Sequence, residues 1–150
     1  MAAATLILGV GNLLLSDEVV GVHIARRLQS MTLPPEIEVI DGGTEGYELI
    51  RFCGSRKRVI IVDCLMARDT PGTVVRADPD QLGLQWAPPY SSHQSGAREL
   101  LQALGCLPHP PQVVVIGIVP ESAGVFGTEL SKAVSASMDK IVMSILEASS

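Results

Sequence analysis

The fold is decided by residues 6–18, LILGVGNLLLSDE, in which a short apolar run meets two glycines and then two adjacent carboxylates. A continuous apolar run of this length that ends at a glycine predicts a buried strand over Thr5–Val10. Apolar residues then recur at near-helical spacing over Asp17–Gln29, and Ser16 or Asp17 can act as the N-cap of that helix. The segment therefore predicts a strand, a glycine-containing turn and a helix, which together form the first unit of an α/β fold.

Composition limits the classes of protein to which this chain can belong. At 150 residues and 15.9 kDa it fits one domain, residues 1–150, and a hydrophobic content of 47% with only 3% aromatics predicts an aliphatic core, as in strands covered on both faces. The formal net charge of −5, without a basic stripe, argues against nucleic acid as a partner. Three cysteines without a CxxC pair favour a reducing compartment. Residues 2–15 lack a basic flank and are too short to cross a membrane, so we expect a cytoplasmic protein without a membrane partner.

The remaining pattern alternates strands with helices. It predicts helices at residues 45–52, 97–104 and 128–147 and strands at 37–41, 59–62, 112–119 and 73–76, the last of these at an edge or antiparallel. We therefore predict an α/β fold, a mostly parallel, twisted sheet of about five strands with helices on both faces. The long loop Ala77–Gln94 contains prolines and Trp86 and has little periodicity, which is typical of a functional segment, and its role stays open. The basic cluster Arg56-Lys57-Arg58 is interpreted as a solvated turn.

Acidic side chains follow several of the predicted strands. These acids are Asp17, Glu18, Asp41, Asp63 and Glu121. Because the carboxyl ends of parallel strands meet at one edge of the sheet, where ligands bind, we expect several of these acids to face one crevice. Gathered carboxylates repel one another unless a cation or an imidazole lies among them, and His93, at the end of the long loop, is the candidate imidazole.

Glu18, Asp63 and His93 form a set of two carboxylates and one imidazole. Such a set suits a hard or borderline divalent metal ion with open coordination positions. The sequence contains no HExxH motif and no cysteine cluster, so a standard zinc site is not supported. The other histidines, His23 and His109, are interpreted as structural or solvated.

Two other classes of function match parts of the sequence. Gly9-Val10-Gly11, with Asp41 after the second strand, imitates a dinucleotide-binding fingerprint, but Leu14 stands where that fingerprint requires glycine. The two acids at the helix start would also repel a pyrophosphate. A nucleophilic hydrolase has less support, because there is no GxSxG motif and Cys64 has no base that is evident in the sequence.

Taken in order, the motifs resemble those of a known family. They are Gly9-Val10-Gly11-Asn12-Leu13-Leu14 with Asp17-Glu18 and Gly21-Val22, then Asp41-Gly42-Gly43-Thr44, Val62-Asp63, Ser92-His93-Gln94 and Gly117-Ile118-Val119-Pro120-Glu121-Ser122. In this order they look like the hydrogenase maturation proteases, the nickel-dependent endopeptidases of [NiFe]-hydrogenase assembly. The resemblance covers nearly the whole chain.

The resemblance implies an enzyme, a metal-dependent or aspartyl-type endopeptidase that removes a C-terminal extension from the nickel-loaded precursor of a [NiFe]-hydrogenase large subunit. It implies that Glu18, Asp63 and His93 are the metal ligands and catalytic residues, and that nickel, supplied by the precursor, is the cofactor. The segment Asp41-Gly42-Gly43-Thr44 resembles the element that discriminates between substrates. The expected partner is the large-subunit precursor, and we expect a monomer. A non-enzymatic nickel-binding assembly chaperone with the same ligands and a nucleotide-binding α/β protein remain as alternatives.

Overall fold

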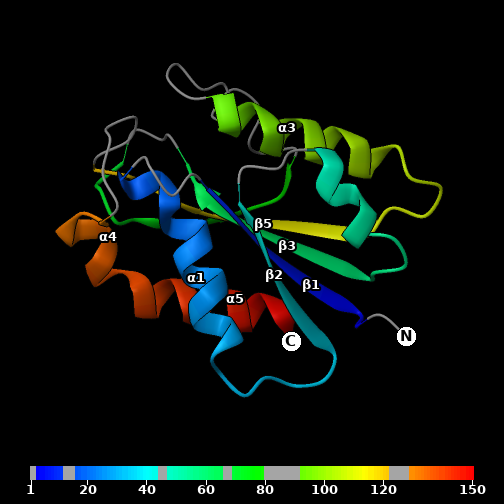
Figure 1. Ribbon diagram of the computed structural model, residues 1–150, viewed down its shortest axis with the longest axis horizontal. Coiled ribbons are helices and arrows are strands. Elements are labelled where there is room, and N and C mark those ends of the chain that lie inside the picture. Colours follow the sequence, from blue (N-terminus) through cyan, green and yellow to red (C-terminus); the bar gives the residue numbers. More distant parts are fainter. Residues whose placement is uncertain (1–2, 12–15, 44–46, 66–68, 80–91, 122–128) are drawn as a thin grey trace.

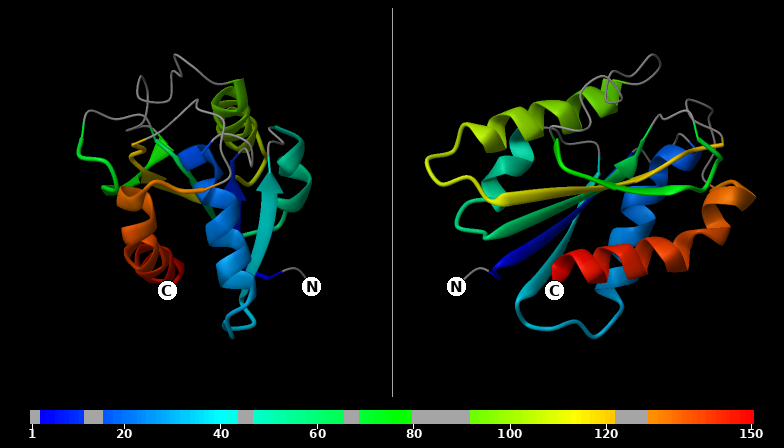
Figure 2. Two further views of the ribbon diagram at one scale, coloured as in Figure 1. Left: turned by 60° about the vertical axis from the view of Figure 1, so that its left-hand side comes forward. Right: turned by 180° about the vertical axis from the view of Figure 1, so that it is seen from behind.

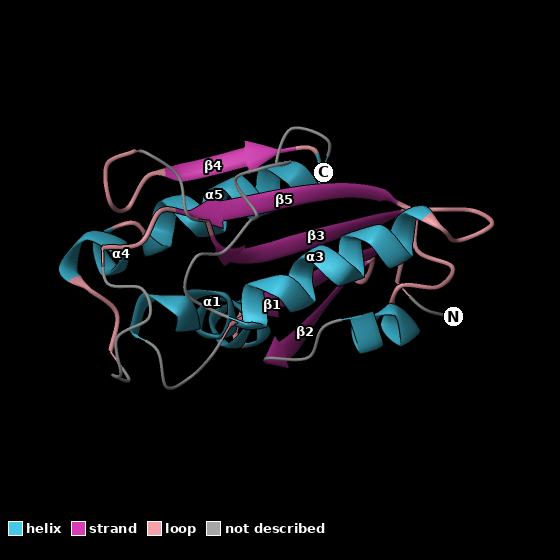
Figure 3. Cartoon of the chain, turned by 90° about the horizontal axis from the view of Figure 1, so that it is seen from above, coloured by secondary structure: helices cyan, strands magenta, loops and turns pink. Residues whose placement is uncertain are grey.

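The computed structural model describes residues 3–11, 16–43, 47–65, 69–79, 92–121 and 129–150. They include a five-stranded sheet with the strand order β2 (Ile37–Gly43), β1 (Thr5–Val10), β3 (Arg58–Cys64), β5 (Gln112–Ile118) and β4 (Val74–Ala77). The first four strands pair in parallel, and β4 pairs with β5 in the antiparallel direction (Figure 1 and Figure 3). The predicted α/β fold, with a mostly parallel sheet and an antiparallel edge strand, is confirmed.

Helices cover both faces of the sheet, as predicted. One face carries α1 (Val20–Gln29) and α5 (Met138–Ser149), with the short α4 (Lys132–Ala136) before α5. The other face carries the 3-10 helix η2 (Tyr47–Phe52) and α3 (Ser92–Gly105), which contact each other (Figure 2). Among the described helices, none has the length and apolar character that a membrane span needs.

The pleat of the strands divides the core into two aliphatic layers. In β1, Leu6 and Leu8 pack with the layer under η2 and α3, whereas Ile7 packs with the layer under α1 and α5. In β3, Ile61 and Ile60 divide between the two layers in the same way. All five side chains are completely buried. The low aromatic content therefore corresponds to a core of branched aliphatic side chains on both faces of the sheet, as the composition predicts.

Gly9 in β1 and Gly21 in α1 allow the helix to lie directly on the sheet. A one-turn 3-10 helix, η1 (Ser16–Val19), leads without interruption into α1. A Cβ on Gly9 would lie 2.0 Å from the carbonyl oxygen of Gly21, and a Cβ on Gly21 would lie 2.1 Å from the carbonyl oxygen of Val10 and 2.5 Å from that of Val62. Neither position has room for a side chain. Gly9 and Gly21 thus set the spacing between α1 and the strands β1 and β3.

The helix starts differ from the predictions in two places. Val19 occupies the N-cap position of α1 and makes no side-chain capping hydrogen bond, so the predicted capping by Ser16 or Asp17 is wrong. α3 begins at Ser92 instead of residue 97, which places His93 in the first turn of a helix instead of at the end of a loop.

The predicted C-terminal helix is divided into α4 and α5 at Ser137. The Ser137 hydroxyl donates to the carbonyl oxygen of Gly72 at 2.6 Å and to that of Ala133 at 3.2 Å. The bond to Gly72 is a tertiary contact, and side-chain hydrogen bonds of this kind compete with the backbone hydrogen bonds of a continuous helix. The apolar periodicity of the sequence carries no sign of such a contact, so it did not reveal the break.

The basic cluster Arg56-Lys57-Arg58 lies at the amino end of β3, and the prediction of a solvated turn is wrong for its two arginines. The Arg56 side chain is 4% exposed and donates to the carbonyl oxygens of Phe52 and Ala3 and to the carboxylate of Glu38. Arg58 donates to carbonyl oxygens at the end of α5, whereas Lys57 is exposed. The two arginines therefore join both ends of the described chain to the amino end of the sheet.

Candidate active site at the carboxyl end of the sheet

Asp63 lies at the carboxyl end of β3, the central strand. The residue is 1% exposed, and its Oδ1 accepts a hydrogen bond of 2.7 Å from the N–H of Cys64. By strand alternation it lies on the same side of the sheet as Ile61, which is the side covered by η2 and α3. Its partner on β5 is Gly117, so no side chain stands beside it on that strand. A buried carboxylate thus occupies the edge where open α/β sheets bind ligands.

Glu18 belongs to η1, which contacts β3, the strand that carries Asp63. Its neighbours Asp17 and Val19 are both completely buried, so the backbone on either side of Glu18 is held against the protein. The Glu18 side chain lies outside the described residues. The structure therefore brings the backbone of Glu18 to the same edge of the sheet as Asp63.

His93 lies in the first turn of α3. This helix packs on the side of the sheet that also holds Asp63, and its N-terminal end lies toward the carboxyl ends of the parallel strands (Figure 3). The His93 side chain lies outside the described residues. The elements that carry the three predicted site residues thus lie at one edge, while the roles of the three side chains stay a prediction.

The segment Asp41-Gly42-Gly43 ends β2, and Thr44 lies outside the described residues. Oδ2 of Asp41 is 3.5 Å from Nε of Arg26 on α1. Its Oδ1 accepts a hydrogen bond of 3.0 Å from the N–H of Gly43, which has a φ of 54°, a left-handed conformation that glycine adopts without strain. The Gly43 carbonyl oxygen accepts a bond of 2.8 Å from the N–H of Gly11. The segment is therefore joined to the turn that follows β1.

The expectation that several acids face one crevice is wrong for Asp41 and Asp17. Asp41 pairs in register with Gly9 and lies on the α1 side of the sheet, opposite to the side of Asp63. Asp17 is completely buried and accepts hydrogen bonds within the fold, and Glu121 is exposed with its backbone N–H bonded to Asp17. Strand ends alone do not place side chains together, because alternation sends successive residues to opposite faces.

Asp17 has a role that the sequence pattern did not predict. Its Oδ1 accepts a bond of 2.7 Å from the N–H of Ser131, and its Oδ2 accepts from the N–H of Glu121 at 2.9 Å and from the Ser131 hydroxyl at 2.8 Å. The partners lie 104 and 114 positions further along the chain. A local motif cannot reveal partners at such separations. The pair of adjacent acids, Asp17 and Glu18, was the one feature of the sequence that drew attention to Asp17.

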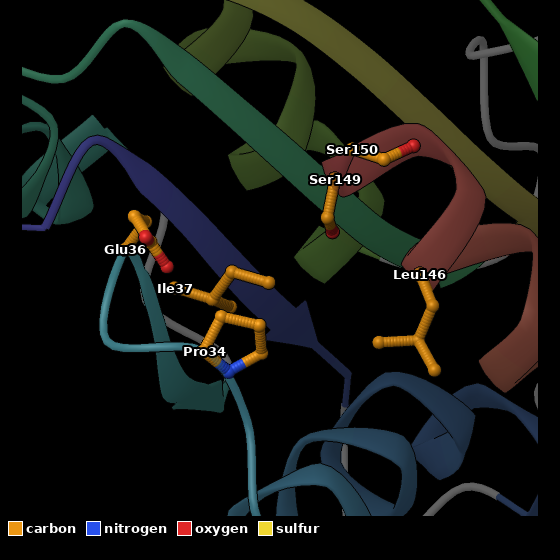
Figure 4. Close-up of a pocket in the computed structure, with 6 residues that line it drawn as sticks. All are labelled: Pro34, Glu36, Ile37, Leu146, Ser149 and Ser150. Carbon is orange, nitrogen blue, oxygen red and sulfur yellow. The ribbon is translucent and has the colours of Figure 1, made fainter.

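Two grooves formed by described residues lie away from this edge. One, of about 420 Å³, lies between the start of β2 and the end of α5 and is lined by Pro34, Glu36, Ile37, Leu146, Ser149 and Ser150 (Figure 4). The other, of about 260 Å³, lies between the end of α3 and the prolines before β5. Neither groove is lined by Asp63, so neither is the cleft of the candidate site.

Metal-binding residue types are not clustered elsewhere in the described structure. Among the side chains that the structure describes, which do not include those of Glu18 and His93, no group of three His, Cys, Asp or Glu residues is placed to hold a metal ion. The set predicted from the sequence therefore remains the candidate, with Asp63 as its described member.

The cysteines do not support a thiol nucleophile. Burial raises the pKa of the Cys53 thiol from 9.0 to about 11, against the opposing effect of the nearby Arg56. Cys64 follows Asp63 but is buried in the layer under α1 and α5, and Cys106 is exposed. A thiol is a nucleophile only as the thiolate, which the raised pKa disfavours at Cys53.

An α/β sheet with a buried carboxylate at its carboxyl edge, an acid in the adjoining turn and a histidine at a helix start belongs to the class of α/β proteins with a ligand or catalytic site at that edge. Comparison with known proteins identifies the family. The family model described as hydrogenase maturation protease (HycI) matches residues 22–148. The chain belongs to this family, and the resemblance and the function predicted from the sequence, a protease of hydrogenase maturation, are confirmed.

Individual relatives support the same assignment. The chain is 37% identical over 120 residues to the hydrogenase 2 maturation protease of Escherichia coli K12, covering 78% of this chain and 73% of that protein. It is 31% identical over 137 residues to the hydrogenase expression/formation protein HupD of Rhodobacter capsulatus, covering 89% of this chain and 65% of the longer relative. The solved structure of the hydrogenase maturating endopeptidase HybD from E. coli matches with a TM-score of 0.86 and 33% identity, over 96% of this chain and 90% of that one. Family membership favours a protease over the chaperone and the nucleotide-binding protein.

Proposed function

We propose that this protein cleaves the C-terminal extension from the nickel-loaded precursor of a [NiFe]-hydrogenase large subunit. Membership of the hydrogenase maturation protease family supports proteolysis, and the names of the relatives place them in hydrogenase maturation. One observation carries the site assignment. The end of β3, the turn η1 and the first turn of α3, which bear Asp63, Glu18 and His93, lie at one edge of the sheet.

Asp63 is the proposed general base. A carboxylate within hydrogen-bonding reach of a water can take its proton as the water attacks the scissile carbonyl. The hydrogen bond from the N–H of Cys64 to Oδ1 holds the carboxylate in one orientation. Since the residue is 1% exposed, its charge acts in a medium of low dielectric constant, where its attraction for a cation or a developing positive charge is stronger than in water.

Nickel enters this proposal as part of the substrate. Two carboxylates and one imidazole suit a borderline divalent ion, so Glu18, Asp63 and His93 would hold the nickel of the precursor. The buried position of Asp63 fits a cationic neighbour, because a cation offsets the cost of keeping a carboxylate away from water. When bound, nickel would orient or polarise the scissile carbonyl.

The proposal is tested by incubating the purified protein with nickel-loaded and with nickel-free precursor and weighing the products by mass spectrometry. We expect only the loaded precursor to lose the mass of its C-terminal extension. Equal cleavage of both forms would contradict the dependence on nickel. No cleavage of either form would contradict the assignment of this substrate.

The same measurement separates the two alternatives. A non-enzymatic nickel chaperone would bind nickel tightly as the free protein and leave the mass of the precursor unchanged. A nucleotide-binding protein would gain thermal stability when a nucleotide is added. The close contacts of Gly9 and Gly21 account for these two glycines without a phosphate ligand.

The segment Asp41-Gly42-Gly43-Thr44 is the proposed element of substrate discrimination. It forms the end of an edge strand of the sheet and is bonded to the turn after β1 through Gly43 and Gly11. Replacing Asp41 by Asn would weaken its pairing with Arg26, and we expect a change in the preference among precursors of different hydrogenases. An unchanged ranking of precursors would remove this role.

We further propose that the protein works in the cytoplasm as a monomer. None of the three cysteines, all of which the structure describes, forms a disulfide bond, which is compatible with a reducing compartment. Cell fractionation and light scattering on the purified protein test the two statements. Recovery outside the cytoplasm, or the mass of a dimer, would contradict them.

A further inference from the structure

The hydrogen bonds of Asp17 connect the turn η1 to two distant parts of the chain. Its carboxylate accepts from Glu121, which follows β5, and from Ser131, the N-cap residue of α4. The Ser131 hydroxyl donates to Oδ2 of Asp17 at 2.8 Å and accepts from the N–H of Val134 at 3.3 Å. From the described residues alone, this buried carboxylate receives three hydrogen bonds, and Ser131 is also the N-cap residue of α4.

η1 depends on these bonds for its position. A single 3-10 turn is not stable on its own, and the N-cap residue of the following helix, Val19, contributes no capping side chain. Asp17 and Val19 are completely buried, so the chain is held on both sides of Glu18. Val19 is held by apolar packing, whereas Asp17 is held by directional bonds from three donors.

We propose that Asp17 is a positioning residue for Glu18 in the cleavage reaction. This inference rests on the proposed function of Glu18. Asp17 does not touch the substrate; it fixes the backbone of η1 relative to β3 and thereby the distance between Glu18 and Asp63. Loss of these bonds is expected to loosen η1 while the sheet and both core layers stay intact, because neither of the described partners, Glu121 and Ser131, belongs to a strand.

The decisive variant is Asp17→Asn, which keeps the shape of the side chain. An amide has one acceptor oxygen, so an NH2 group replaces one of the two carboxylate oxygens. In either orientation this NH2 group faces a backbone N–H, that of Ser131 or that of Glu121, and one of the present hydrogen bonds is lost. Ser131→Ala is the milder variant, because it removes the hydroxyl and leaves the backbone N–H of that residue in place. Both variants alter the bonds of η1 without changing Glu18, Asp63 or His93.

The matched control is Glu38→Gln at the opposite end of the sheet. Glu38 accepts from Arg56 at 2.9 and 3.2 Å, so the control weakens a charged hydrogen bond at the amino ends of the strands. It lowers stability without touching η1. Comparison with this control separates a loss of positioning from a general loss of stability.

The experiment measures kcat and KM for the nickel-loaded precursor, together with hydrogen exchange of the backbone amides of η1. For Asp17→Asn we expect kcat to fall by about 10- to 100-fold, the range for residues that orient a ligand from outside, with KM little changed and faster exchange at η1. Ser131→Ala should fall between this variant and the wild type, and Glu38→Gln should keep the wild-type kcat.

Each outcome decides the inference. A folded Asp17→Asn variant with wild-type kcat, or with unchanged exchange at η1, would overturn it. If Asp17→Asn does not fold, Ser131→Ala supplies the same comparison. If the wild-type protein does not process the precursor, the proposed function fails, and the exchange at η1 still decides whether Asp17 holds the turn.

Discussion

The two ends of the parallel sheet use buried charges in different ways. At the amino end, the arginines of the basic cluster direct their hydrogen bonds to carbonyl oxygens and to Glu38, all within the fold. At the carboxyl end, two adjacent acids have different roles. Asp17 accepts hydrogen bonds within the fold, and Glu18 is a proposed ligand of the nickel that the precursor carries. A charge at the amino end therefore stabilises the protein, whereas the charges at the carboxyl end include those of the proposed site, at the edge where loops and helix N-termini converge.

The largest effect is expected for Asp63→Asn, which removes the charge at the carboxyl end. Processing of the precursor should fall by about 10²- to 10⁴-fold, the contribution typical of a general base. The amide keeps the shape and can still accept from Cys64, so the circular dichroism spectrum should stay unchanged. Mass spectrometry of the precursor after incubation provides the measurement. Retained activity would remove Asp63 from the mechanism and weaken the contrast between the two ends.

Gly21→Ala tests the spacing between α1 and the central strands, on which the carboxyl end depends. The added Cβ would lie 2.1 Å from the Val10 carbonyl oxygen, so we expect a loss of about 3 kcal/mol or more in the free energy of unfolding. Gly54→Ala is the matched control, since a Cβ there meets no atom within 4 Å. Urea denaturation compares the two. Equal stability of both variants would show that α1 can move away from the sheet at little cost.

Arg56→Met tests the amino end. It removes the donors to Phe52, Ala3 and Glu38 while keeping an apolar stem, so the free energy of unfolding should fall by about 2–3 kcal/mol. At temperatures where the variant is folded, its kcat for the precursor should equal that of the wild type. A fall in kcat would mean that a change at the amino end of the sheet affects the reaction at the carboxyl end, although the two ends share no hydrogen bond among those described.

The smallest effect concerns Cys53 and pH. The pKa of its thiol is raised by burial from 9.0 to about 11, so its contribution to stability is fully present below pH 9.0 and is lost as the pH rises toward 11. Between about pH 8 and pH 11 the wild type should therefore lose more free energy of unfolding than Cys53→Ala, by less than the loss expected for Arg56→Met, as followed by urea denaturation. An equal loss in both proteins would show that this thiol does not titrate differently on unfolding.

The sequence predicted the fold well because the fold follows from local patterns. The apolar run at Thr5–Val10 and the period of the first helix each need only neighbouring residues to be recognised, and the order of strands and helices requires a parallel sheet. The helix break at Ser137 and the buried state of Arg56 were missed. Both depend on partners far away in the chain, Gly72 and Ala3, which no local window contains.

The candidate site was predicted in part. The residue types of Glu18, Asp63 and His93 were selected from the strand ends and from the ordered motifs, and the structure places their three elements at one edge of the sheet. The sequence did not predict on which face of the sheet each of the remaining acids lies. Asp41 and Asp63 both lie near the carboxyl ends of their strands, but a difference of one residue in register sends their side chains to opposite faces.

The opening segment shows what each level determines. By itself the sequence predicted a strand, a turn and a helix start over residues 6–18, and it indicated that acids at the helix start disfavour a phosphate ligand. Only the tertiary structure decided why Gly9 is there and what Asp17 does: Gly9 makes room for Gly21, and Asp17 accepts hydrogen bonds from Ser131. The physical reason is range. Backbone conformation and hydrophobic period are set by near neighbours, whereas close packing and buried hydrogen bonds are set by residues that meet only when the chain is folded.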